Sequence, residues 1–254
     1  MAVLTKNQQI ETLASQGFVV ASGLVPPEQR ARLRECALAQ LAEAAAPVEY
    51  EADLRYRGAP ASRDALGGAT PRRLLDAYGR NAAFAQMALA RDIHGWMQNW
   101  FGEAVRLSRA HHNCLMTKHP LYGSLTGWHR DSRYWSFERD DLVSAWIALG
   151  PETASNGALW FVPGSHRLAL ASEHFDEASF FREDHVENAT LIQQAVCPTL
   201  AAGDVVFFHC NTLHAAGKNL SDQVKLSLVF TYHGISNAPR IGTRSASRPE
   251  VDLA

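Results

Sequence analysis

The second half of the chain alternates short β-rich runs with turn signals, and this pattern restricts the possible folds more than any other feature of the sequence. From about residue 110 onward, β-branched and aromatic residues gather in the runs "LVSAWIALG", "GALWFVPG", "DVVFFHC" and "VKLSLVFTYH". Asn156-Gly157 is a hairpin signal and Pro163-Gly164 marks another reversal, so neighbouring strands are expected to run antiparallel. Because no long helical pattern separates these runs, parallel crossover units are not expected. The pattern predicts a two-sheet sandwich or jelly roll.

The first hundred residues or so have helical periodicity, with apolar residues three and four positions apart. Helices are predicted before Gly17, after Pro26-Pro27 and over residues 72–105, and the polar stretch between the last two is expected to be a long loop. We therefore expect one mainly β domain, in which a helical layer at about 1–105 packs on one outer face of a jelly-roll core at about 106–236, with a C-terminal tail at 237–254.

Charge and composition exclude several classes of partner. The formal net charge is -2, with 24 Lys and Arg against 26 Asp and Glu, so we expect no broad basic surface for nucleic acid. No apolar run is long enough for a membrane span. The four cysteines show neither Cys-x-x-Cys nor zinc-ribbon spacing, and the start of the sequence does not resemble a secretory signal. These features predict a cytoplasmic protein with free thiols.

The segment "GWHRD" offers two metal ligands. In an extended strand, side chains at positions i and i+2 point to the same face, so His129 and Asp131 can reach one ion while Arg130 points away. A third ligand is available in "GDVVFFHCNTLHAAGKN", where either His209 or His214 could return to the same place. Two imidazoles and one carboxylate form the ligand set of non-haem Fe(II) oxygenases. Zinc hydrolases use similar ligands, so the triad alone leaves the reaction open.

The run "QVKLSLVFTYH" has one apolar face and one face that carries Lys225, Ser227 and Thr231. If the second face met water, Lys225 would be an ordinary solvated lysine. If that face lined the interior of a barrel, the ammonium would need a carboxylate partner. The run follows the candidate ligand His214 after a short turn, which favours the interior position.

From about Gly17 to His233 the chain resembles the phytanoyl-CoA dioxygenase family of Fe(II) and 2-oxoglutarate dependent oxygenases. The resemblance lies in six segments in the family's order: "SQGFVV", "GWHRD", "VSAWIALG", "SNGALWFVPGSHR", "GDVVFFHCNTLHAAGKN" and "VKLSLVFTYH". It implies a double-stranded β-helix, with iron bound by His129, Asp131 and His214. The family's distal histidine falls on His214 and not on His209, because His214 precedes the matching Gly-Lys-Asn. The clamp for the 2-oxoglutarate carboxylate falls on Lys225, and Trp146 matches a tryptophan of the co-substrate pocket.

The chain departs from the family pattern at three positions. Lys225 stands where an arginine is usual. Its ammonium group binds a carboxylate as a single point charge, whereas a guanidinium group makes two parallel hydrogen bonds. Ala216 replaces a serine that commonly helps to bind the co-substrate, so Ser227 or Thr231 is the candidate for that hydroxyl. Arg130 replaces a glutamine. The carboxylate that iron halogenases lack is present as Asp131, so the resemblance implies hydroxylation of a C–H bond, using dioxygen and releasing succinate and CO2. The alternatives are a metal-binding jelly roll that binds or senses a ligand without turnover, and a zinc hydrolase.

Arginines are abundant around the expected mouth of the pocket. Arg130 and Arg133 flank Asp131, and five more belong to the preceding loop: Arg55, Arg57, Arg63, Arg72 and Arg73. If they are not simply solvated, they predict an anionic substrate held by Arg133 and at least one loop arginine, with Trp128, Tyr134 and Trp135 available for stacking. Residues 172–190 are acidic and aromatic, which suits either a solvent-exposed loop or a lid that packs over the site.

Overall fold

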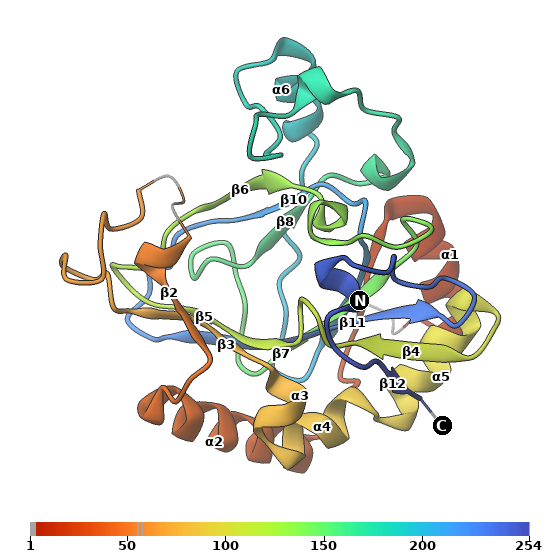
Figure 1. Ribbon diagram of the computed structural model, residues 1–254, viewed down its shortest axis with the longest axis horizontal. Helices are drawn as coiled ribbons and strands as arrows, with labels where there is room; N and C mark the ends of the chain where they lie inside the picture. Colours follow the sequence, from red (N-terminus) through yellow and green to blue (C-terminus); the bar gives the residue numbers. More distant parts are fainter. Residues whose placement is uncertain (1–3, 55, 57, 254) are drawn as a thin grey trace.

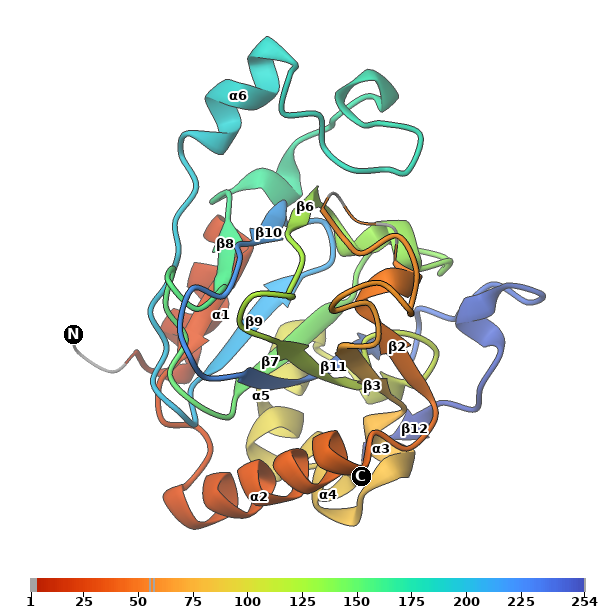
Figure 2. The same cartoon turned by 90° about the vertical axis from the view of Figure 1, so that its left-hand side faces the viewer.

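The computed structural model describes residues 4–54, 56 and 58–253. Its centre is a large antiparallel sheet with the order β1-β9-β7-β11-β5-β3-β2, to which β4 and β12 are added beside β11. A second antiparallel sheet, β6-β10-β8, lies across from it (Figure 2). The two sheets make the jelly roll that the sequence predicts. The strands are β1 Phe18–Ala21, β2 Val48–Tyr50, β3 Pro71–Leu75, β4 Val105–Ser108, β5 Cys114–Lys118, β6 Thr126–His129, β7 Val143–Ala148, β8 Leu159–Phe161, β9 Val205–His209, β10 His214–Ala216, β11 Lys225–Gly234 and β12 Val251–Asp252.

Helices cover the outer face of the large sheet, as expected (Figures 1 and 2). α1 ends at Gly17, whose left-handed backbone (φ 81°) suits glycine, and α2 begins at the predicted Pro-Pro. The α-helices are α1 Lys6–Gln16, α2 Pro27–Glu43, α3 Ala77–Arg80, α4 Ala82–Ala88, α5 Arg91–Phe101 and α6 Val186–Ile192, and short 3₁₀ helices are η1 Glu51–Asp53, η2 Asp131–Tyr134, η3 Ser165–Arg167, η4 Ser172–His174 and η5 Arg244–Ala246.

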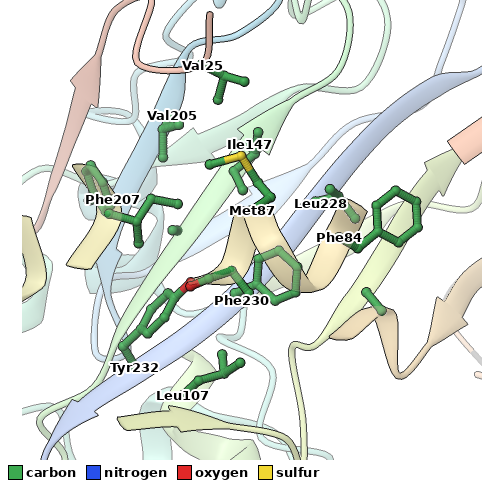
Figure 3. Packing of buried hydrophobic residues seen from close by; sticks show 14 of the residues in the cluster. Val25, Phe84, Met87, Leu107, Ile147, Val205, Phe207, Leu228, Phe230 and Tyr232 are labelled. Carbon is green, nitrogen blue, oxygen red and sulfur yellow. The ribbon is translucent and has the colours of Figure 1, made fainter. Parts of the chain in front are cut away.

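Strand β11 separates two interiors. Its even-numbered residues Leu226, Leu228, Phe230 and Tyr232 belong to the apolar core between the large sheet and the helices. In Figure 3, Leu228 and Phe230 lie beside Phe84 and Met87 of α4. The odd-numbered side chains face the space between the two sheets, where Val229 packs with Trp146 and Phe208. All ten residues of β11 are buried, so the water-facing interpretation of Lys225 was wrong.

The first hundred residues are mainly helical, and they also contribute β1, β2 and β3 to the large sheet. Two details of the expected fold were wrong. The predicted helix from residue 72 begins as strand β3, in which burial alternates along the strand. Asn156-Gly157 does not close a hairpin within one sheet, because β7 lies in the large sheet and β8 in the small one.

Candidate active site between the two sheets

Three metal-ligand side chains meet on the inner side of the small sheet. His129 is the last residue of β6, His214 is the first of β10, and the two are paired across these strands. Asp131 is the first residue of η2, so the strand ends before it, but Arg130 keeps an extended backbone and preserves the alternation. Asp131 Oδ1 lies 3.5 Å from the Nε2 atoms of both His129 and His214. Ligand atoms from all three side chains lie within 4.8 Å of one another.

Backbone carbonyls fix the tautomer of both histidines. His129 Nδ1 lies 2.8 Å from the carbonyl oxygen of Gly127, and His214 Nδ1 lies 3.0 Å from that of Thr212. A carbonyl only accepts a hydrogen bond, so each Nδ1 carries the proton and each Nε2 keeps a lone pair that can bind an ion lying between it and Asp131. Burial, followed by the proximity of His129, lowers the pKa of His214 to about 4, which keeps this ring in the neutral form that binds metals.

Asp131 is a fully buried carboxylate. Within the described residues neither of its side-chain oxygens accepts a hydrogen bond, although His112 Nδ1 lies 3.1 Å from Oδ2. Burial alone would raise the pKa of Asp131, but His112 and His214 outweigh this effect and hold it well below the usual range. A buried anion left without donors is costly, and a cation between Asp131 and the two Nε2 atoms would compensate for that cost. The triad therefore fits a divalent metal.

A cavity adjoins the triad and is lined by both sheets. Lys225 and Val229 of β11, Trp146 of β7 and Met116 and Lys118 of β5 contribute to its wall. Both lysines are buried, with 7% of Lys225 and 4% of Lys118 exposed. Burial, followed by the charges of Arg72 and Lys225, holds the pKa of Lys118 well below its usual range. The cavity thus joins a metal-ligand triad to two buried amines.

Glu152 binds three of the side chains expected around the co-substrate. Its carboxylate accepts hydrogen bonds from Lys225 Nζ at 3.0 Å, Ser227 Oγ at 2.6 Å and Trp146 Nε1 at 3.0 Å. Glu152 is fully buried. The carboxylate partner that Lys225 needs in the interior is therefore present in the chain itself. The other candidate hydroxyl, Thr231 Oγ1, lies 2.7 Å from Ser144 Oγ and is already paired.

His209 and Arg130 lie away from the triad, as expected. The Nε2 atom of His209 is 3.6 Å from Asp141 Oδ1, and its ring lies beside His166. Arg130 donates hydrogen bonds to the carbonyl oxygens of Ser165 and Leu168. These bonds connect the end of β6 to η3 and the residue that follows it.

The expected substrate residues divide into two groups. Tyr134 and Arg133 line a second cavity, and the Arg133 guanidinium lies 4.0 Å from the centre of the Phe180 ring. Trp128 packs with Val162 and Leu213 on the other side of β6, since it precedes His129 by one position. Trp135 packs in an apolar cluster with Phe137, Leu142 and Cys210. The structure therefore brings Arg133 and Tyr134 to a cavity and places both tryptophans in apolar clusters.

Most loop arginines have carboxylate partners. Arg63 pairs with Asp53, Arg72 with Glu51 and Arg73 with Glu49. Arg55 and Arg57 lie outside the described residues. Of the loop arginines that the structure describes, Arg72 and Arg73 line the triad cavity.

The second cavity adjoins the first, and Arg73 and His112 line both. Its wall also includes Arg109, Arg133, Arg244 and Arg248 against the acidic residues Glu49 and Asp76. Asp76 pairs with Arg109 and Arg248. The wall is therefore cationic, and two of its arginines come from the C-terminal tail.

The segment at 172–190 packs beside the triad at one end. Phe181 donates a backbone hydrogen bond to the carbonyl oxygen of Trp128, and the Phe180 ring lies 5.9 Å from the His129 ring. The following helix α6 projects beyond the small sheet (Figures 1 and 2). A lid movement of this segment stays a prediction.

Sequence reasoning missed Glu152 and the tail arginines. Glu152 stands in the turn-rich stretch "PETASNG", where an acidic residue usually meets water, and nothing local indicates that the chain folds it inward. Lys118 also lies beside the site. The i+2 alternation in "CLMTK" could have placed Lys118 on the same face as Met116.

The comparisons with known proteins agree with the resemblance. The family model described as phytanoyl-CoA dioxygenase (PhyH) matches residues 13–227. An ectoine dioxygenase of Halomonas elongata is 25% identical over 245 residues, which are 90% of this chain and 70% of that protein. An ectoine dioxygenase of Stutzerimonas stutzeri is 28% identical over 127 residues, and that match spans 44% of this chain and less than half, 42%, of the relative.

Solved structures support the same fold. The crystal structure of EctD from S. alaskensis with 2-oxoglutarate and 5-hydroxyectoine has a TM-score of 0.79 and 22% sequence identity to this chain, and the likeness covers 98% of this chain and 83% of that one. At this identity the likeness concerns the fold. The helix-flanked jelly roll is thus shared with a protein whose structure holds 2-oxoglutarate. Among the described residues, no helix is both long and apolar enough to cross a membrane.

Proposed function

Because this chain belongs to the phytanoyl-CoA dioxygenase family, we propose that it is an Fe(II) and 2-oxoglutarate dependent oxygenase that hydroxylates a C–H bond of a small molecule. The observation that carries the proposal is the buried triad of His129, Asp131 and His214, in which the carboxylate has no hydrogen-bond donor among the described residues. Iron with 2-oxoglutarate and dioxygen supplies the oxidising power and releases succinate and CO2.

The residues of the chain bind and orient the reactants. His129 and His214 present Nε2 lone pairs because backbone carbonyls hold their Nδ1 protons, and Asp131 supplies the anionic ligand. An iron ion held by these three side chains would supply the site at which the co-substrates react. Lys225 offers its ammonium to the distal carboxylate of 2-oxoglutarate, and its Nζ lies 3.0 Å from Glu152 Oε2 and 4.9 Å from the centre of the Trp146 ring. Ser227 is held by the same glutamate.

We propose an anionic primary substrate. The second cavity shares His112 and Arg73 with the triad cavity, and its arginines outnumber its acidic residues. Guanidinium groups bind carboxylates and phosphates through paired hydrogen bonds. Arg133 and Arg244 line this cavity without a carboxylate partner in the described part of the chain. They are the candidates for gripping the substrate anion, while Tyr134 covers its apolar part.

The test is formation of succinate from 2-oxoglutarate by the iron-loaded protein in air, measured with panels of carboxylated, phosphorylated and uncharged compounds. An anionic compound is expected to stimulate succinate formation in the wild type and not in Asp131→Ala. A protein that binds iron and 2-oxoglutarate yet forms no succinate with any panel would instead be a non-catalytic ligand-binding jelly roll. Hydrolysis of a panel compound without oxoglutarate, supported by zinc, would favour a hydrolase.

A further inference from the structure

Two buried lysines face each other across neighbouring strands. Lys225 of β11 and Lys118 of β5 are paired in the antiparallel ladder, and both line the cavity beside the triad. Like charges at directly opposed positions of a sheet repel each other, and burial increases the repulsion. Two lysines in this arrangement therefore need compensating negative charge.

In the part of the chain that the structure describes, an acidic side chain pairs with only one of these two lysines. Lys225 pairs with Glu152 at 3.0 Å. Lys118 Nζ donates a hydrogen bond to the carbonyl oxygen of Ser124 at 2.6 Å, and no carboxylate lies within ion-pair distance of it among the described residues. Glu51, the nearest acidic group in this network, accepts hydrogen bonds from Arg72 and from Ser124. The three groups Lys118, Lys225 and Glu152 thus have a formal charge of one positive unit when both amines are protonated.

Two glycines hold the stem of Lys118 in the cavity wall. A Cβ atom at Gly123 would lie 3.1 Å from Lys118 Cδ, and one at Gly157 would lie 3.0 Å from Cγ and 3.1 Å from Cε. The backbone carbonyl of Lys118 accepts a hydrogen bond from Asn219 Nδ2 at 2.7 Å. The lysine is therefore packed along its length, so its ammonium position is built into the fold and is not that of a mobile surface side chain.

We propose that Lys118 is a second carboxylate-binding residue, which holds the distal carboxylate of 2-oxoglutarate together with Lys225. This inference rests on the proposed oxygenase function. One carboxylate placed between the two ammonium groups neutralises the one positive charge that remains after Glu152 is paired with Lys225. A 2-oxoacid without a distal carboxylate leaves Lys118 uncompensated in a buried site, so the lysine pair selects a dicarboxylate.

The test compares two ligands that differ only at this carboxylate. 2-Oxopentanoate has the five-carbon chain of 2-oxoglutarate with a methyl group in place of the distal carboxylate. Binding of each is measured by calorimetry, without oxygen, on protein loaded with Mn(II) in place of iron. The variants are Lys118→Met and, as the matched control, Lys218→Met, which removes an exposed lysine.

Lys118→Met is expected to weaken 2-oxoglutarate binding about ten- to hundredfold, the effect of losing one charged hydrogen bond, and to leave 2-oxopentanoate binding within about twofold. Lys218→Met is expected to match the wild type for both ligands. Equal weakening of both ligands in Lys118→Met would show a packing role and overturn the inference, as would unchanged 2-oxoglutarate binding. A wild type that binds Mn(II) but not 2-oxoglutarate would contradict the proposed function itself.

Glu152→Gln provides a second test if Lys118→Met does not fold. The glutamine oxygen can still accept the hydrogen bonds of Trp146 and Ser227, but Lys225 loses its fixed anion. The two ammonium groups then share only the ligand's carboxylate, so 2-oxoglutarate is expected to bind more tightly while 2-oxopentanoate does not. Weaker 2-oxoglutarate binding in Glu152→Gln would contradict the charge balance on which the inference depends.

Discussion

Glu152 and Lys225 are each other's charge partners in a buried site. Lys225→Met is expected to lower the free energy of unfolding by roughly 3 to 5 kcal/mol, because it leaves the carboxylate of Glu152 buried without its counter-ion. The same variant is expected to raise the dissociation constant of 2-oxoglutarate at least about tenfold. Denaturant unfolding and calorimetry measure the two effects separately.

The double variant Lys225→Met with Glu152→Gln separates stability from binding. Neutralising both partners is expected to restore most of the lost stability, since no buried charge is left without a partner. Binding of 2-oxoglutarate should remain weaker than in the wild type. If affinity returns together with stability, Lys225 acts only through Glu152 and does not contact the co-substrate.

At the residue scale, the features of the site that could be predicted are those that depend on the spacing of neighbouring residues in the sequence. The i+2 relation of His129 and Asp131 survives although the strand ends between them, because Arg130 stays extended. The interior position of Lys225 follows from alternation along β11. Glu152 could not be predicted because two of its three partners, Lys225 and Ser227, lie 73 and 75 residues away, and the intervening chain crosses both sheets.

At the element scale, the turn between β7 and β8 controls the shape of the cavity wall. Gly157 has φ 78°, and a Cβ there would lie 2.9 Å from the carbonyl oxygen of Gly217 and 3.0 Å from Lys118 Cγ. Gly157→Ala is expected to lower the free energy of unfolding by roughly 1 to 2 kcal/mol for the left-handed backbone and roughly 1 to 3 kcal/mol for crowding. Because Lys118 must shift, 2-oxoglutarate binding should also weaken.

Gly102→Ala is the matched control for Gly157→Ala. Gly102 ends α5 with φ 69°, and a Cβ there would meet nothing within 4 Å. Its replacement is expected to lower stability by only the backbone contribution, roughly 1 to 2 kcal/mol, without changing ligand affinity. If both variants bind 2-oxoglutarate like the wild type, the approach of Gly157 to Lys118 does not position the ammonium.

Periodicity also limits what could be predicted of the elements. Helices α1 and α2 and strands β7, β9 and β11 follow from long, regular patterns and from glycine or proline at their ends. Strands β1, β2 and β3 are short, and their identity depends on long-range partners, since β1 pairs with β9 and β3 with β5. Asn156-Gly157 predicts a turn correctly, but a turn does not specify which sheet receives the next strand.

At the scale of the whole molecule, a slightly negative protein concentrates arginines in one cavity. The formal net charge is -2, yet Arg73, Arg109, Arg133, Arg244 and Arg248 line the cavity next to that of the triad. Arg133→Ala is expected to raise the apparent KM for an anionic substrate about three- to tenfold, as for a partly exposed charged hydrogen bond. Added salt should raise the KM of the wild type in the same direction, because it screens exposed charges.

The control for Arg133→Ala is Arg32→Ala, which removes an exposed arginine of α2 on the helical side of the large sheet (Figure 2). This variant is expected to keep the wild-type KM and its salt dependence. A best substrate that is uncharged, turned over normally by Arg133→Ala, would contradict the anionic class and leave the oxygenase proposal intact. The tail arginines were not predicted because nothing local in residues 244–248 indicates that they return to the cavity.

Metal binding tests the central claim most directly, since every proposed step depends on an ion held by His129, Asp131 and His214. Titration of the metal-free protein with Fe(II) under nitrogen is expected to give one bound ion per chain, and no measurable binding in His129→Ala or His214→Ala. His209→Ala should bind one ion like the wild type, because His209 lies against Asp141 and outside the triad. Equal loss of iron in His209→Ala, or retained iron in His214→Ala, would contradict the assignment of the site.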